Sequence, residues 1–185
     1  GSRLVYPSHF NTKERTVVLE GEGYFEVSHD AEHPFYVYAG DSKVQVLGTA
    51  FNIAAYREEM QQQVVLCSGS IALETGGEKA LMKPGQLAQV RDGKQTGITA
   101  VDPGIHTAWK DHHLVAVHTT LNEILRRLSR YYNKKILINS TIGNETFSGD
   151  IDLKNNMEDV LKTIADATSM RHEYDVSGNI IFNKK

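Results

Sequence analysis

The segment VVLEGEGYFEVSHDAEHPFYV, residues 17–37, concentrates side chains that could do acid–base or metal chemistry. Its ionisable residues are Glu20, Glu22, Glu26, His29, Asp30, Glu32 and His33. Two carboxylates can share acid–base work, and two histidines four residues apart on a helix can bind zinc. However, residues 17–27 alternate apolar and polar side chains, which is typical of a strand with one exposed face. Pro34 disfavours helix at His33. We therefore predict an exposed strand face followed by a turn.

Other candidate chemistry is equally weak. His112 and His113 are adjacent, so on a strand they point to opposite faces. The chain has no G-x-S-x-G motif, phosphate-binding loop or dinucleotide fingerprint. We predict a protein that is not an enzyme, with no catalytic residue, cofactor or metal ligand. The alternative is a metal-binding, cupin-like β-sandwich that acts as an enzyme or metal sensor through His29, His33 or His113, because "KPGQLAQV" is similar to a cupin turn.

Composition indicates an ordinary globular protein. Of the 185 residues, 40% are hydrophobic and 23% are charged, which is enough apolar material for a core. The net charge of −3 argues against nucleic acid as a partner. The sequence has no apolar run of about 20 residues, so no membrane span is predicted within it.

The first hundred residues have a pattern typical of short β-strands separated by turns. Short strand-like runs follow residues 17–27 and are separated by Gly-, Asp- and Ser-rich turns. They are Phe35–Tyr38, Lys43–Val46, Ala50–Tyr56, Gln63–Cys67, Ser70–Glu74, Leu87–Arg91 and Gly97–Val101. No helix is predicted before Ala108. Such spacing indicates a β-sandwich or barrel, and we predict an antiparallel, jelly-roll-like β-sandwich.

In the remaining residues, apolar side chains recur at the spacing of α-helices. Two segments, "LNEILRRLSRYY" and "NNMEDVLKTIADA", carry apolar residues at helical spacing. Thr120 with Glu123 has the spacing of a capping box, and Asn156 is a good N-cap. Strand-like runs surround both segments, which predicts a small β-α-β-β-α-β-β domain. We therefore expect two domains, residues 1–108 and 109–185, with a mainly β fold followed by an α+β fold.

Two sets of residues in the second half are candidate contacts. The strand around Asn179, Ile180, Ile181 and Phe182 is short, apolar and terminal, so we predict that it is a sheet edge to which a partner strand adds. The alternative is that its apolar side chains only pack under the helices. Trp109 lies at the junction of the halves. We predict an interdomain contact there, and the alternative is burial within one domain.

Several linked motifs resemble one protein family over nearly the whole chain. "GEGYFEV" (Gly21–Val27), "HPFYVYAGDSKVQVLGTAFNI" (His33–Ile53), "LMKPGQLA" (Leu81–Ala88) and "VDPGIHTAWKDHHL" (Val101–Leu114) resemble the periplasmic part of FecR-type anti-sigma regulators, in the same order. The second half is similar to the secretin/TonB short N-terminal module. Gly23, Ser68 and His112 depart from the family's usual residues.

The resemblance implies a signal regulator rather than an enzyme. It implies the periplasmic sensor of an inner-membrane, single-pass protein. That sensor receives a signal from the signalling domain of an outer-membrane TonB-dependent transporter. The regulator acts on an extracytoplasmic-function sigma factor through a cytoplasmic segment. That segment and the anchor helix are both expected outside this chain.

Overall fold

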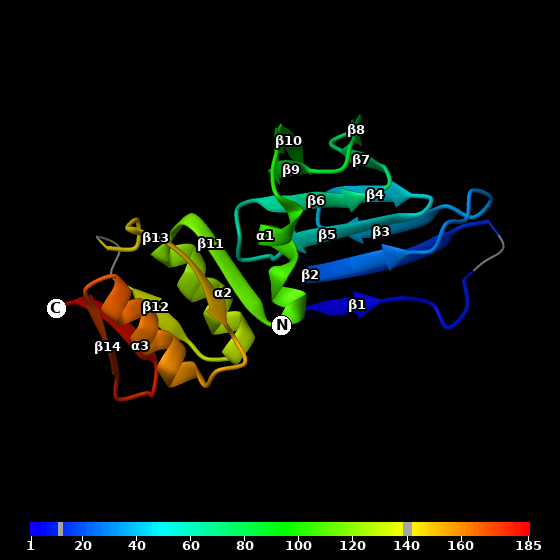
Figure 1. The fold of residues 1–185 in the computed structure, drawn as a ribbon. Coiled ribbons are helices and arrows are strands. Elements are labelled where there is room, and N and C mark those ends of the chain that lie inside the picture. The colour runs from blue at the N-terminus through cyan, green and yellow to red at the C-terminus, as the bar shows by residue number, and fades with distance from the viewer. Residues whose placement is uncertain (11–12, 139–141) are drawn as a thin grey trace. The chain divides into compact units, whose positions relative to one another are not determined.

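The structure is a computed structural model that describes residues 1–10, 13–138 and 142–185. The chain divides into two compact units, Ser2–Thr107 and Ala108–Lys185, which are described separately below (Figure 1). The first unit is almost entirely strand, and the second combines strands with two longer helices. The expected fold class, mainly β followed by α+β, is confirmed.

The described residues of the first unit form one ten-stranded, curled sheet. Its order is β10-β9-β6-β5-β2-β3-β4-β7-β8, and β1 also pairs with β2. The strands are β1 (Arg3–Val5), β2 (Arg15–Val27), β3 (Phe35–Ala39), β4 (Ser42–Val46), β5 (Thr49–Ala55), β6 (Gln62–Ser68), β7 (Ile71–Thr75), β8 (Glu78–Met82), β9 (Gln86–Arg91) and β10 (Lys94–Ala100).

The long strand β2 belongs to both halves of this sheet. Residues 15–19 pair with β3, and residues 21–27 pair with β5. Gly21, the first residue of β2 that pairs with β5, has φ +90°, a conformation that residues other than glycine rarely adopt. β3 begins beside the start of β2, so this pair is parallel, whereas the other strand pairs among the described residues of the unit are antiparallel. The sheet therefore curls around a single core that includes Val37, Val44, Phe51, Ile53, Leu66, Ile71 and Leu73.

A short helix, α1 (Pro103–Thr107), ends the first unit. The expectation of no helix before Ala108 was therefore wrong. Asp102 Oδ1 accepts a hydrogen bond from the Gly104 N–H at 2.8 Å, and Pro103 brings a φ already suited to the first helical position. A five-residue helix is too short for apolar periodicity to reveal it.

The second unit has the predicted order of elements. After the 3-10 turn η1 (Ala108–Asp111) it runs β11 (His113–Thr120), α2 (Leu121–Tyr132), β12 (Ile136–Ile138), β13 (Thr146–Asp152), α3 (Met157–Ala167), β14 (Met170–Tyr174) and β15 (Ile180–Lys184). Its described residues form two sheets, β11-β13 and β12-β15-β14. Helix α2 contacts strands of both sheets, and α3 contacts β14.

Both long helices begin as the sequence predicts. The Thr120 side chain accepts the Glu123 N–H, and the Asn156 side chain accepts the Asp159 N–H. Each bond satisfies a backbone donor that a helix start leaves unpaired. The apolar faces of the two helices and the inner residues of both sheets form one core that includes Leu121, Ile124, Leu125, Leu128, Leu161, Ile164 and Phe182.

Candidate interaction surface

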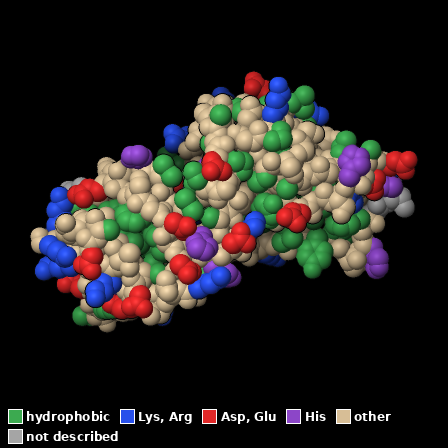
Figure 2. All heavy atoms as spheres, in the orientation of Figure 1, with side chains coloured by type: hydrophobic (Ala, Val, Ile, Leu, Met, Phe, Trp, Pro, Cys, Tyr) green, Lys and Arg blue, Asp and Glu red, His purple; other side chains and the backbone are tan. Residues whose placement is uncertain are grey.

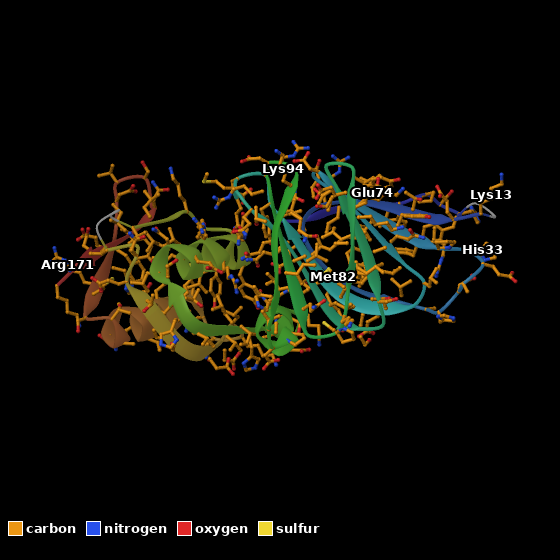
Figure 3. The ribbon with its side chains drawn as sticks, turned by 90° about the horizontal axis from the view of Figure 1, so that it is seen from above. Lys13, His33, Glu74, Met82, Lys94 and Arg171 are labelled. Carbon is orange, nitrogen blue, oxygen red and sulfur yellow. The ribbon has the colours of Figure 1, made fainter. Side chains whose placement is uncertain are left out.

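The acid–histidine segment folds as a strand and a turn, as the alternation predicts. The Asp30 carboxylate accepts the backbone N–H groups of Glu32 and His33, both at 3.1 Å, and contacts His33 Nδ1 at 2.8 Å. The hydrogen bond with His33 lowers the pKa of Asp30 below its usual value. Arg15 holds the same loop by donating to the His33 and Ser28 carbonyls. Figure 3 shows His33 and Lys13 at the same end of the first unit.

The glutamates of β2 do not act as a pair. Glu20 forms an ion pair with the exposed Arg57. Glu22 is half-buried, and its Oε1 accepts a hydrogen bond from Asn52 Nδ2 at 2.9 Å. Asn52 is only 3% exposed, so this bond satisfies a buried amide. Glu22 therefore has a structural role in addition to its place on the outer face of the strand.

Three of the described histidines, His33, His113 and His172, each pair with one carboxylate. In residues 1–10, 13–138 and 142–185, no group of three or more His, Cys, Asp or Glu side chains is placed to hold a metal ion. His29 lines a shallow, open hollow of about 470 Å³ with Glu26 and Ser68. In the second unit, His113 Nδ1 lies 2.9 Å from Asp150 Oδ1.

The structure corrects the predicted binding edge at residues 179–182. Strand β15 is the central strand of its sheet, parallel to β12 on one side and antiparallel to β14 on the other. Ile180 and Phe182 are buried, and the Asn179 side chain donates to Asp175. A strand that is paired on both sides has no free backbone groups for a partner strand. The error arose because the last strand in sequence is not the last strand in the sheet.

Trp109 lies in η1 and is half-buried. Its role as an interdomain contact stays a prediction.

Strand β14, one true edge of this sheet, is tied to α3 by a small polar network. His172 Nε2 lies 2.7 Å from Glu158 Oε1, and the Tyr174 hydroxyl donates to Glu158 Oε2 at 2.7 Å. The His172 ring also stacks on the buried Phe182 ring. These hydrogen bonds, with His172 contributing most, lower the pKa of Glu158. On the opposite face of β14, Arg171 extends outward (Figure 3).

Strand β12 is the other edge. It pairs only with β15 among the described residues, and Leu137 on it is 40% exposed. Elsewhere, acidic and basic side chains are mixed over the visible face of each unit (Figure 2). The sequence contained a signal for this edge, since "KKILI" is an apolar triplet after two lysines, but no sequence pattern gives the order of strands in a sheet.

Comparison with known proteins assigns the chain. The model of the FecR protein family matches residues 1–76, and the model of the FecR C-terminal region matches residues 113–182. The chain belongs to the FecR family. Two crystal structures of a candidate anti-sigma factor from Parabacteroides distasonis ATCC 8503 resemble this FecR chain along its whole length. Each is 26% identical, is covered to 87% of its own length and has a TM-score of 0.88 or 0.87.

Two further findings complete the comparison. No curated protein matches the FecR chain. Within the described residues, none of the helices has the length and apolar character needed to cross a membrane. The family and the two similar structures point to an anti-sigma factor regulator that works through protein partners.

Proposed function

We propose that this FecR chain is the periplasmic sensor of an anti-sigma regulator. It relays a signal from an outer-membrane TonB-dependent transporter to an extracytoplasmic-function sigma factor by protein–protein interaction. The observation that carries the proposal is the match of both FecR regions, in order, to the two compact units of the chain. The similarity to a candidate anti-sigma factor over the full length supports it.

The two units have separate roles in this proposal. Residues 1–108 form the FecR-type sensor domain, and residues 109–185 form the small domain that binds the signalling domain of the transporter. The sigma factor binds a cytoplasmic segment, and a membrane helix anchors the protein in the inner membrane. In this proposal both parts belong to the full regulator, and nucleic acid is not a partner of the chain.

A relay of this kind needs a binding surface and a coupling free energy, but no chemical step. The second unit meets the first requirement because two short sheets expose strand edges to which an extended partner segment can add. In the opening cluster of acids and histidines, Asp30 contacts His33 and Glu22 accepts a hydrogen bond from Asn52, so these residues have structural partners. In this proposal the site is a protein-binding surface.

A direct binding measurement tests the proposal. The full chain is titrated by calorimetry with purified signalling domains of TonB-dependent transporters from the same genome, and signalling domains from an unrelated genome serve as controls. The proposal predicts saturable binding to at least one cognate domain and none to the controls. Absence of binding to every cognate domain contradicts it. Metal analysis of the same preparation gives an independent check on the metal-binding alternative.

A further inference from the structure

The outer edge of β12 presents unpaired backbone groups. Ile180 N–H donates to the Lys135 carbonyl at 3.0 Å, and Ile136, Leu137 and Ile138 align with β15 in parallel register. Successive residues of a strand direct their backbone groups to opposite sides. Leu137 therefore bonds to β15, whereas the N–H and C=O groups of Ile136 and Ile138 face away from it. Within the described residues, no hydrogen bond reaches these outward groups.

The side chains of β12 are already arranged for a strand to be added. Ile136 and Ile138 pack against the core of the second unit, so the backbone is fixed. Leu137 faces the other side of the sheet and is 40% exposed, next to the half-buried Ile181 on β15. An added strand could form hydrogen bonds with the outward backbone groups of β12 and pack an apolar side chain beside Leu137 on the outer face of the sheet.

Along the sequence, the charge around this edge has one sign, and Lys135 also lies close enough to Asp175 to help lower the pKa of that carboxyl. Between Glu123 and Glu145 the chain has five basic residues, Arg126, Arg127, Arg130, Lys134 and Lys135, and no acidic residue. Arg127 is neutralised by Glu123 within α2. Lys134 and Lys135 are exposed and lie after the end of α2, immediately before β12. Cations on the last turn of a helix stabilise its dipole, but these two lysines lie beyond that turn.

We propose that the outer edge of β12 binds an extended, acidic segment of a partner protein, which adds to the sheet beside Ile136–Ile138. The inference rests on the proposed function as a protein-binding regulator and specifies the chemistry of the partner. Lysines at a sheet edge also oppose edge-to-edge pairing of identical chains, since the lysines of two copies would repel. The same lysines attract carboxylates, so the edge selects against a second copy and for an acidic strand.

Strand β14 is the less suitable edge. Two of its five residues, His172 and Tyr174, are already engaged with Glu158 of α3. Its outward side chains, Arg171 and Glu173, have opposite charges and give no preference for partner charge.

Two peptide probes test the edge directly. The isotope-labelled full chain is titrated with a blocked nine-residue peptide of alternating valine and glutamate, and separately with one of alternating valine and lysine. The acidic peptide is expected to shift the amide signals of residues 134–138 and to slow hydrogen exchange at Ile136 and Ile138 about tenfold or more. The basic peptide is expected to do neither. Equal effects of both peptides, or shifts confined to other residues, would overturn the proposal.

Matched variants separate main-chain pairing from side-chain contact. Ile136→Pro removes one outward N–H and retains the bonds of Leu137 to β15, and proline is tolerated at such edge positions. Ile136→Ala loses comparable packing but keeps the N–H. The proposal predicts that the proline variant, with its fold verified by circular dichroism, no longer responds to the acidic peptide and that the alanine variant does. Loss of the response in both variants contradicts strand addition.

A second pair of variants tests the charge. Lys134→Glu is expected to weaken binding of the acidic peptide about tenfold, whereas Lys162→Glu on α3 is expected to leave it within about twofold.

Vesicles containing phosphatidylglycerol, and dilution of the chain alone, serve as further probes. Protection of Ile136 and Ile138 by the vesicles, or protection that depends only on protein concentration, would point to a membrane or a second copy and overturn the inference.

The inference and the proposed function can fail separately. A cognate signalling domain that binds the full chain without changing the β12 amides would refute the inference and leave the proposed function intact. An acidic peptide that protects Ile136 and Ile138, with no signalling domain binding, would refute the function and leave the edge assignment intact.

Discussion

Replacement of Phe182 by alanine tests whether β15 is a structural strand rather than a binding edge. Phe182 is fully buried in the core of the second unit, and its ring stacks on that of His172 with centroids 5.7 Å apart. Truncation of a buried phenylalanine to alanine costs about 3–5 kcal/mol, from lost transfer free energy and the cavity left behind. At about 4–8 °C per kcal/mol for a domain of this size, the melting temperature of the second unit should fall by at least about 12 °C.

The neighbouring residue provides a matched control. Ile181 lies on the same strand but is half-buried on the outer face of the sheet, so Ile181→Ala should cost about 1 kcal/mol. Chemical denaturation of each full-length variant, followed by amide signals of residues 142–185, gives both free energies of unfolding. The reasoning is refuted if Phe182→Ala is no more destabilising than Ile181→Ala.

Three further predictions concern other parts of the chain. Hydrogen bonds from His172 and Tyr174 lower the pKa of Glu158 below 4.5, so the stabilising contribution of Glu158 should be complete above that pH and disappear as the pH falls through the lowered pKa. In urea unfolding between about pH 5 and pH 3, the free energy of unfolding should therefore fall more steeply for the wild type than for Glu158→Gln. Equal slopes for the two proteins would contradict this. A Cβ at Gly48 would lie 2.6 Å from His29 Cα, so Gly48→Ala should destabilise the first unit by about 1–3 kcal/mol in thermal unfolding. Gly97 has open space around the position of a Cβ, so Gly97→Ala should change the free energy of unfolding by less than about 1 kcal/mol. If Trp109 fixes the arrangement of the two domains, Trp109→Ala should broaden the small-angle scattering distance distribution, and an unchanged profile would argue against that role.

Local features of the fold could be predicted from the sequence, because short-range chemistry determines them. Alternation in residues 17–27 indicated β2, and the Thr120 and Asn156 caps indicated where α2 and α3 begin. The short helix α1 could not be seen, since five residues do not complete an apolar period. The strands β1 (Arg3–Val5) and β8 (Glu78–Met82) were also not predicted, because their sequences, RLV and EKALM, do not alternate apolar and polar residues.

The candidate site depended on information that a sequence pattern does not contain. Ile180 and Phe182 were recognised as alternating apolar residues, but alternation is the same for an edge strand and a central strand. The order β12-β15-β14 places the last strand of the chain in the centre of the sheet and Ile136–Ile138 at one edge. The strand itself was predictable, since Lys135–Ile138 is a strand-like run in the sequence, but its place at the edge of the sheet was not.

The central claim is that this FecR chain acts by binding the signalling domain of a TonB-dependent transporter. The most direct measurement is a calorimetric titration of the full chain with the cognate domain. The account predicts a saturable one-to-one complex that weakens as the salt concentration rises, because charged side chains contribute to the contact. A titration that shows no heat and no complex with any cognate signalling domain, using a chain verified as folded, would contradict the account.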